Sequence, residues 1–392
     1  MAISSPLDPL HQQAEATFLM YGSGDPASGG AVAVVESFGE LEAEYAAIRK
    51  GCVLMDLPYR GVAVAKGRER LDFLNRMVTQ EMKAFAPFEV RRSFWLTRRG
   101  RIDADLRLVH LEEHTLIDCD VLATARAVKG LSDFLFSEEA SFEDATARLH
   151  RLALHGPTAA ALLAAVSTPE AGPGVSTLEP DRACRVKIGG KDVTVFRDDA
   201  TGDAGFELIL ATDDVSAVYE QLLERGLADA SIRLRTAGWH AFNIARIEAG
   251  RPVYNIDFGP ESLPHECGEP TLRDRVSFTK GCYLGQEIVA RMQSLGHPKQ
   301  VLVGLKIGEA STSSTEAQAE SGTPVLLPVE GAEPKSVGAV TSSTRSPMLG
   351  DRGVCFAQVK WEHRAPGTRV ALRAGGADLG ASVNESLVFW KR

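Results

Sequence analysis

Several common features are missing from this 392-residue sequence, and each absence excludes a class of protein. No Lys or Arg precedes Arg49, and no apolar run is long enough to cross a bilayer, so we expect neither a signal peptide nor a membrane-spanning helix. The six cysteines are scattered without a C-x-x-C pair, so a disulfide framework is not expected. This cysteine usage indicates a reducing compartment and predicts a cytoplasmic protein.

Basic charge is also scarce. The formal net charge is -9, which argues against a general nucleic-acid-binding protein, although a local basic pocket for an anionic ligand is compatible with it. No Rossmann fingerprint accompanies a strand-to-helix turn, and no G-K-[ST] sequence ends a glycine-rich loop. We therefore expect neither a dinucleotide enzyme nor a Walker-type phosphate site.

The residues that are present are typical of a soluble globular protein, with 44% hydrophobic and 24% charged residues. The length is sufficient for two or three domains. Residues 1–40 are rich in Gly, Ser, Ala and Pro, which predicts a mobile N-terminal extension. Helical and strand patterns then alternate to about residue 300. Short alternating strands separated by Gly and Pro follow, and they indicate a small β-barrel or sandwich.

The most informative stretch is residues 280–291, K-G-C-Y-L-G-Q-E-I-V-A-R. We predict that Gly281 adopts backbone angles closed to other residues and that Gly285 permits a close approach of backbone or ligand. The pattern after Gly285 is helical, and the exposed amides at a helix start favour a carboxylate or phosphate. On composition alone, a glycine turn followed by a core helix is the plainer interpretation.

Two carboxylates in predicted strands are candidates for chemistry. Asp105 lies in a hairpin over residues 93–110, on the strand face that carries alternating charges, so the choice is between a solvated face and a pocket. Glu207 lies in the apolar strand of T-G-D-A-G-F-E-L-I-L, residues 201–210. Burying a carboxylate there is costly unless it is paired, and a surface strand is the alternative.

These segments resemble one known family. K-G-C-Y-L-G-Q-E is similar to the K-G-C-[FY]-x-G-Q-E signature of YgfZ-type proteins, which belong to the folate-binding superfamily of the glycine-cleavage T-protein. G-R-I-D-A-D-L, T-G-D-A-G-F-E, R-I-E-A-G and G-A-V-T-S-S-T-R-S-P also resemble segments of that superfamily, so the similarity runs from about Gly51 to the C-terminal strands.

The resemblance implies an α+β fold in which two intertwined α/β domains surround a central folate pocket and a β-barrel follows at the C-terminus. The domains expected are a mobile extension (1–40), a first folate-binding domain (41–150), a second one carrying the K-G-C-Y-L-G-Q-E motif (151–300), and the barrel (301–392). The cofactor implied is tetrahydrofolate or a one-carbon-substituted derivative.

The resemblance also implies roles for individual residues. Asp105 takes the position of an aspartate beside the reactive nitrogens of the folate, although the T-protein commonly has two successive acids where this chain has Ala104 and Asp105. Glu207 takes the position of a glutamate that accepts hydrogen bonds from the pterin, and Arg246 that of an arginine near the folate. Cofactor contacts are also expected from the motif residues Lys280, Gly281, Tyr283, Gly285, Gln286, Glu287 and Arg291.

Cys282 is the second candidate for a chemical role. We interpret it as a buried thiol near helix-start amides, which would stabilise its thiolate. His265 and Cys267 lie elsewhere in the same half of the chain, but their spacing to Cys282 matches no standard zinc pattern, so no metal site is expected.

Two functions remain open. The first is a YgfZ-like tetrahydrofolate-binding protein that supports assembly or repair of iron–sulfur enzymes, and we favour it because the Cys282 signature is specific. The second is a tetrahydrofolate-dependent aminomethyl or one-carbon transferase like the glycine-cleavage T-protein, which Asp105, Glu207 and Arg246 favour. The partners implied are a reduced folate and either an iron–sulfur protein or a lipoyl-carrier protein.

Overall fold

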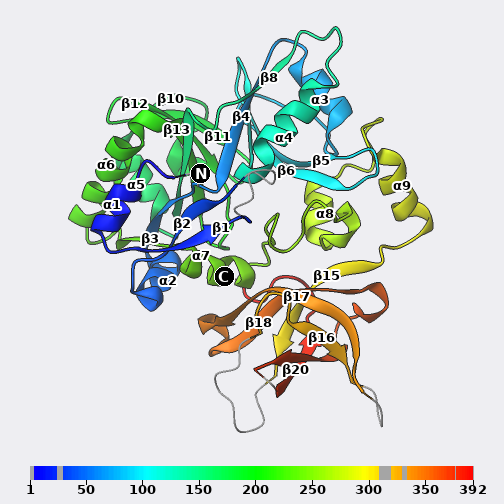
Figure 1. Cartoon of the computed structure of the whole chain (residues 1–392). Coiled ribbons are helices and arrows are strands. Elements are labelled where there is room, and N and C mark those ends of the chain that lie inside the picture. Colours follow the sequence, from blue (N-terminus) through cyan, green and yellow to red (C-terminus); the bar gives the residue numbers. More distant parts are fainter. Residues whose placement is uncertain (1–3, 24–29, 309–318, 329–332, 376, 392) are drawn as a thin grey trace. The chain divides into compact units, whose positions relative to one another are not determined.

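The computed structural model describes residues 4–23, 30–308, 319–328, 333–375 and 377–391 (Figure 1). Helices and mainly antiparallel sheets are both present, so the predicted α+β class is confirmed. The chain forms two compact units. The first unit comprises Met1–Trp95 and Ala104–Phe242, and the second comprises Leu96–Asp103 and Asn243–Arg392. The finer division expected at residues 41, 151 and 301 stays a prediction.

The N-terminal part of the first unit differs from the mobile extension expected over residues 1–40. It forms α1 (Asp8–Gln13) and a hairpin of β1 (Thr17–Tyr21) and β2 (Val32–Ser37). Leu7 is fully buried in the core of the unit, and His11 Nε2 lies 3.1 Å from Oδ2 of the buried Asp56. These two contacts explain the regular structure, which the Gly- and Ser-rich composition does not indicate.

A seven-stranded sheet forms one layer of the first unit, in the order β10-β11-β12-β13-β9-β3-β14. Its bounds are β3 (Cys52–Asp56), β9 (Leu149–His155), β10 (Ser167–Ala171), β11 (Ala183–Ile188), β12 (Lys191–Arg197), β13 (Gly205–Ala211) and β14 (Leu234–Thr236). Helices α5 (Ala159–Val166) and α6 (Val215–Ala228) pack against each other, and their apolar residues join those of the sheet in one core (Figure 1). Strands β11 and β12 form a hairpin that turns at Gly189 and Gly190.

A five-stranded sheet forms a second layer, in the order β5-β6-β7-β4-β8. Its bounds are β4 (Arg60–Lys66), β5 (Val90–Leu96), β6 (Ile102–His110), β7 (Thr115–Asp120) and β8 (Ser141–Asp144). The remaining helices of the unit are α2 (Leu41–Lys50), α3 (Arg70–Met77) and α4 (Val121–Ser132). One apolar cluster contains residues of both sheets, among them Val64, Val109, Phe196 and Ile209, so the sheets share a core.

The second unit contains the barrel that the sequence predicts. Its strands are β15 (Gln300–Ile307), β16 (Pro324–Leu327), β17 (Lys335–Ser346), β18 (Arg352–Lys360), β19 (Arg369–Ala374) and β20 (Ala377–Val383), and they close in the order β15-β18-β17-β16-β19-β20. Before the barrel come α7 (Trp239–Glu248), which begins in the first unit, α8 (Glu269–Arg275) and α9 (Gln286–Leu295). Within the described ranges, no helix is long and apolar enough to span a membrane.

Candidate functional site

The five-stranded sheet of the first unit carries a row of charged side chains on one face. Arg107 on β6 is directly opposite Asp118 on β7, and Asp118 pairs with Val62 on β4. Because side chains alternate along a strand, Arg60, two residues before Val62, lies on the same face as Asp118. Arg60 donates to both oxygens of Asp118, from Nε at 3.2 Å and from Nη2 at 2.5 Å.

The seven-stranded sheet carries a second row. Glu207 on β13 is opposite Ala153 on β9, and Arg151 and His155 lie two residues to either side of Ala153. The alternation therefore places Arg151 and His155 on the same face as Glu207, as its two diagonal neighbours. Glu207 is 4% exposed, and Arg151 and His155 are fully buried. The surface-strand alternative for Glu207 is therefore wrong.

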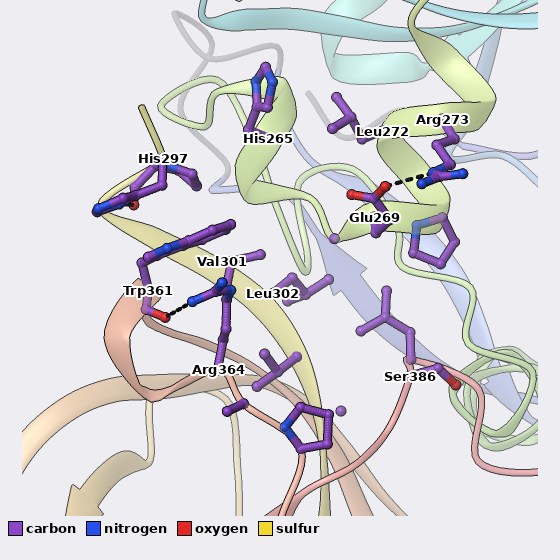
Figure 2. A pocket seen from close by; sticks show the side chains of 18 of the residues that line it. His265, Glu269, Leu272, Arg273, His297, Val301, Leu302, Trp361, Arg364 and Ser386 are labelled. Carbon is purple, nitrogen blue, oxygen red and sulfur yellow. Dashed lines mark hydrogen bonds and ion pairs between the residues drawn. The ribbon is translucent and has the colours of Figure 1, made fainter. Parts of the chain in front are cut away.

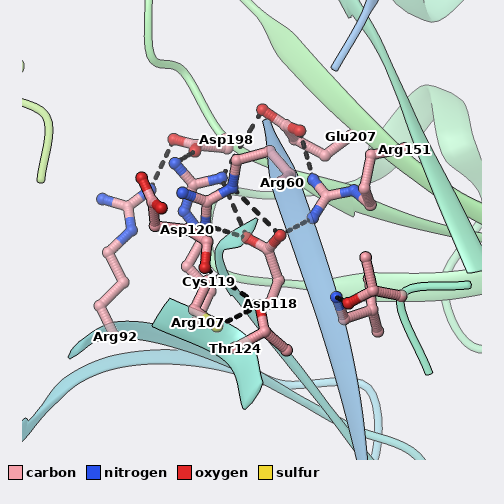
Figure 3. Close-up of polar contacts among 12 residues, drawn as sticks. Arg60, Arg92, Arg107, Asp118, Cys119, Asp120, Thr124, Arg151, Asp198 and Glu207 are labelled. Carbon is pink, nitrogen blue, oxygen red and sulfur yellow. Dashed lines mark hydrogen bonds and ion pairs between the residues drawn. The ribbon is translucent and has the colours of Figure 1, made fainter. Parts of the chain in front are cut away.

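The two rows meet in one network, which we call the Glu207 cluster: Arg60, Arg92, Arg107, Asp118, Arg151, Asp198 and Glu207 (Figure 3). Arg151 joins the two sheets, because it donates one hydrogen bond to Asp118 and another to Glu207. Arg107 Nη2 lies 2.7 Å from Asp198 Oδ2, and its Nη1 lies 3.6 Å from Glu207 Oε1. Four arginines thus compensate three carboxylates, and the carboxylates and Arg151 are buried while the other three arginines are half-buried.

The pKa values in the cluster follow from this pairing. Burial alone would raise the pKa of Asp118, but Arg151, Arg60 and Arg107 together hold it below its ordinary value. Burial opposes the charge of Arg60, yet Asp118 outweighs it and keeps the pKa of Arg60 well above the usual range. Both groups are therefore charged at neutral pH.

His155 stands apart from the network. Neither of its ring nitrogens has a hydrogen-bond partner within the described ranges, although the side chain is fully buried. Burial lowers its pKa, and Glu207 and Asp198 only partly oppose that shift. Gly205 is opposite His155, and a Cβ at Gly205 would approach His155 Nδ1 to 2.6 Å. A glycine is thus required for the imidazole to lie there.

Three aromatic rings form a series of contacts that begins at His155. The ring of His155 lies 5.5 Å from that of Phe242, Phe242 lies 5.7 Å from Trp239, and Trp239 lies 5.5 Å from Tyr59 in an edge-on contact. Burial raises the pKa of Tyr59, with a further contribution from the charge of Glu207. The first unit therefore combines a carboxylate, an imidazole with no hydrogen-bond partner among the described residues, and a series of aromatic rings.

Asp105 lies on β6 on the same face as Arg107 and is half-buried. The opposite face of the strand is fully buried, with Ala104, Leu106 and Leu108 at 0% exposure. The structure thus confirms the two faces that the alternation predicts. It also shows that the charged face does not simply meet solvent, because Arg107 belongs to the Glu207 cluster.

The K-G-C-Y-L-G-Q-E motif lies in the second unit and leads into α9. Gly285 is the residue before the helix, with a φ of 80°, and a Cβ there would lie 2.8 Å from the carbonyl oxygen of Thr97. Gly100 lies in the turn of residues 97–100, and a Cβ added to it would lie 2.8 Å from Cβ of Ile288. The motif is thus packed closely against the turn 97–100. Gly281, by contrast, has no positive φ, and no atom of the described residues lies within 4 Å of a Cβ added there, so the backbone role predicted for it is wrong.

The side chains of the motif differ in burial. Lys280 and Tyr283 are buried, with Lys280 Nζ 5.1 Å from the centre of the Tyr283 ring, and burial raises the pKa of Tyr283 to about 12. Gln286 is half-buried, and Glu287 and Arg291 are exposed on α9. Cys282 is exposed as well, which corrects the expectation of a buried thiol. The loop turns this side chain outward between the buried Lys280 and Tyr283.

Arg246 also belongs to the second unit and is fully buried. Its Nε lies 2.9 Å from Oδ1 of Asn243, and its Nη1 lies 2.7 Å from Oδ2 of Asp257. Asp257 in turn accepts hydrogen bonds from the hydroxyls of Thr341 and Ser342 on the barrel strand β17. These contacts connect α7 to the barrel.

Two cavities lie outside these sites. One, of about 810 Å³, lies in the second unit between α8, the end of α9 and the barrel (Figure 2). There Trp361 is stacked on His297 at 5.3 Å and on the guanidinium of Arg364 at 3.5 Å. The other, of about 630 Å³, lies in the first unit. None of the site residues predicted from the sequence lines either cavity.

Sequence reasoning missed Arg151 and Asp118 of the Glu207 cluster, and His155 beside it. Arg151 and His155 are the polar residues of R-L-A-L-H, at a spacing of four in an otherwise apolar strand, and this spacing places them on one face. Asp118 interrupts the buried strand β7 in the same way. A polar or charged residue inside an apolar strand pattern was therefore the signal that could have identified these positions from the sequence. Within the described ranges, no group of three His, Cys, Asp or Glu side chains is placed to hold a metal ion.

Comparisons with known proteins identify the family of this two-unit α+β protein. The GCVT N-terminal domain family matches residues 26–274, so the chain belongs to that family. The aminomethyltransferase of Symbiobacterium thermophilum is 29% identical over 356 residues, covering 88% of each chain, and that of Chlorobium chlorochromatii is 26% identical over 396 residues, covering 98% of this chain and 97% of the other. The crystal structure of the glycine cleavage system aminomethyltransferase T from Bartonella henselae has the same fold, with a TM-score of 0.83 at 24% identity over 99% of this chain and 98% of the other.

Proposed function

We propose that the protein binds a reduced folate, tetrahydrofolate or a one-carbon-substituted derivative, beside the Glu207 cluster and transfers a one-carbon unit. One observation carries this proposal. Asp105 lies on the same face of β6 as Arg107, and Arg107 Nη1 lies 3.6 Å from Oε1 of Glu207 on β13. Asp105 and Glu207, the two acids with counterparts in the folate-binding superfamily, are therefore both on this side of β6. The near full-length similarity to aminomethyltransferases supports the transferase over the accessory role favoured from the sequence motif.

The residues around Glu207 suit a flat, polar heterocycle. Arg151 binds Glu207 Oε2, while Oε1 lies 3.6 Å from Arg107, beyond hydrogen-bond length, and keeps capacity to accept a bond from a ligand N–H. The imidazole of His155 has donor and acceptor capacity without a protein partner within the described ranges. The nearby rings of Phe242, Trp239 and Tyr59 offer an apolar wall.

Tetrahydrofolate, when bound, supplies a nucleophilic nitrogen for a methylene carbon delivered by a carrier. The chain itself supplies Asp105, a carboxylate that can orient the folate and hold a proton. Arg107 follows Asp105 on the same face, and the ion pair with Asp198 holds the Arg107 side chain there. We assign Asp105 to proton handling, Glu207 to pterin recognition, and Arg151 to the positioning of Glu207.

The test is a paired measurement on the purified protein: calorimetry with tetrahydrofolate, and transfer from an aminomethyl-lipoyl donor to tetrahydrofolate. In Asp105→Asn, we expect folate affinity to fall modestly and transfer to fall about a hundredfold to ten-thousandfold, the usual value of general acid–base help. Asp103→Asn, the same change two residues earlier on the same strand face, is the control and should lose less than tenfold. Equal losses in both variants would contradict the role proposed for Asp105. A wild type that binds no folate would overturn the whole proposal.

A second function is favoured by one observation, the exposure of Cys282 within the motif that resembles the YgfZ signature. An outward thiol is accessible to a protein partner, which an accessory role in iron–sulfur enzyme assembly or repair requires. Folate binding without transfer from the aminomethyl-lipoyl donor, together with a Cys282→Ser variant that folds but fails to complement loss of the protein in cells, would establish this function in place of the transferase.

A further inference from the structure

The 630 Å³ cavity of the first unit lies outside the Glu207 cluster. It is lined by residues of α1, of the turn before α2, of α2 itself, of α6 and of β14. Its volume falls within the range of about 300–1,000 Å³ that is usual for small-molecule sites. Leu10, Leu223 and Leu234 contribute apolar walls, and Leu227 at the rim is 64% exposed. The cavity can therefore hold the apolar body of a small organic molecule.

Aromatic rings form one corner of this cavity. Phe38 and Tyr219 line it, and His11 lies edge-on to both, at 5.7 Å from the Phe38 ring and 5.6 Å from the Tyr219 ring. The three rings are thus held in a fixed arrangement. Faces of aromatic rings carry partial negative charge, and rings arranged around a cavity attract organic cations.

The charged residues of the lining are predominantly acidic. The lining contains three glutamates, Glu40, Glu44 and Glu220, and one guanidinium, that of Arg235, which leaves an excess of two negative charges. Glu40 pairs with Arg235. Glu44 is held by hydrogen bonds from the backbone N–H groups of Phe38 at 2.7 Å and Gly238 at 2.9 Å.

Glu220 differs from the other two acids. It is exposed on α6 and has no ion-pair partner in the part of the chain that the structure describes. Its carboxylate is therefore the one available to a ligand. The 810 Å³ cavity of the second unit contrasts with this, because its two glutamates and two arginines balance and indicate no ligand charge.

We propose that the 630 Å³ cavity is a binding site for an organic ammonium ion with an apolar body, separate from the folate site, with the cation between Glu220 and the Phe38–Tyr219 corner. The ligand would contact both α1 and α6. Binding should therefore hold the N-terminal helix against the unit as well as fill the cavity.

The test uses the full chain and n-hexylamine, with n-hexanol and n-hexanoate as neutral and anionic probes of the same length, in ligand-detected NMR titrations. Hexylamine should bind saturably and more tightly than hexanol, its affinity should fall as salt is added, and hexanoate should bind least. Hexyltrimethylammonium, which donates no hydrogen bond, tests the aromatic corner, and Phe38→Leu should weaken its binding about two- to fivefold.

Glu220→Gln removes the charge and keeps the shape, and it should weaken hexylamine about two- to fivefold, the effect of one exposed ion pair. Glu224→Gln is the matched control, because Glu224 is an exposed glutamate one turn further along α6 that does not line the cavity. Equal effects of the two variants would mean that the acidic protein attracts amines without a site. Equal binding of hexylamine and hexanol, or no saturable binding of either, would also overturn the proposal. Folate binding is measured alongside and should be unchanged in Glu220→Gln, so a failure of one proposal leaves the other testable.

Discussion

Glu207, which we propose recognises the pterin, also belongs to the charged network inside the first unit. It is nearly fully buried, and its position depends on Arg151, which is bound on its other side to Asp118. An isolated buried charge is very costly, so the carboxylate and the guanidinium must be present together. The contacts that position Glu207 Oε1 are therefore also contacts of the buried interior.

The first prediction concerns this pairing. Glu207→Gln should lower the free energy of unfolding by about 2–3 kcal/mol, because Arg151 loses a charged partner and keeps only Asp118. Urea denaturation followed by circular dichroism measures the change. The exposed Glu224→Gln is the control and should stay within about 0.5 kcal/mol of the wild type. A similarly small loss in Glu207→Gln would show that Arg151 does not depend on Glu207, and folate affinities of the variant are meaningful only where it is folded.

His155 predicts a pH dependence with a definite sign. Its pKa is lowered in the folded state relative to an ordinary value of 6.5, so the unfolded chain binds a proton more readily. The contribution of His155 to stability is thus fully present above about pH 6.5 and is lost as the pH falls toward the lowered folded-state pKa. The loss approaches about 1.4 kcal/mol per pH unit.

Comparison of the wild type with His155→Leu, which cannot titrate, isolates this contribution. Unfolding free energies measured between pH 7 and pH 5 should fall more steeply in the wild type. His110, whose pKa is also lowered by burial, is present in both proteins and does not affect the difference. Parallel curves would mean that His155 does not titrate between the two states in this range.

At the scale of elements, the loop before α9 is fitted to the turn 97–100 by two glycines of different origin. Gly285 comes from the K-G-C-Y-L-G-Q-E motif and Gly100 from the hairpin of β5 and β6, and each has a positive φ and a neighbour that leaves no room for a Cβ. The motif glycines therefore do not share one role, because Gly281 is unconstrained.

This difference supplies a matched pair of variants. Gly285→Ala should destabilise the protein by about 1–3 kcal/mol, since alanine is strained at a φ of 80° and its Cβ would lie 2.8 Å from the Thr97 carbonyl oxygen. Gly281→Ala should change stability by less than about 1 kcal/mol in either direction. The midpoints of chemical denaturation give both values. Equal effects would contradict the close packing of the motif against the turn.

The elements also show what the sequence can and cannot predict. The two faces of β6, the hairpin at Gly189 and Gly190, and the barrel strands follow from alternation and turn residues, which are local properties. The partners of Glu207 do not, because Arg151 is 56 residues away and reaches Glu207 only through the register of β9 against β13. The outward direction of Cys282 is equally hidden, since a loop has no periodicity that separates inside from outside.

At the scale of the whole chain, the candidate residues are divided between the two units. Asp105 and Glu207 belong to the first unit, and Arg246 and Cys282 belong to the second. Asp105, Glu207 and Arg246 have counterparts in the transferase function and Cys282 in the accessory function, so the transferase candidates come from both units and the accessory candidate from the second alone. Because the exposed cysteine, Cys282, lies in the second unit, a count of the reactive thiols of the native protein reports on that unit.

Cys282 is the one exposed cysteine of the six, all of which lie within the described ranges. Burial raises the pKa of Cys184 to about 11 and the pKa values of Cys119 and Cys355 to about 12, so these thiols are also poor nucleophiles in the folded protein. A disulfide-exchange reagent should therefore modify one thiol quickly in the native protein and six in denaturant. Cys282→Ser should abolish the fast reaction and leave the denaturation midpoint nearly unchanged, because its side chain is not packed in the core. A fast thiol that persists in Cys282→Ser would contradict the placement of this loop. If the variant lacks the fast thiol but retains full one-carbon transfer, the cysteine is dispensable for the transferase.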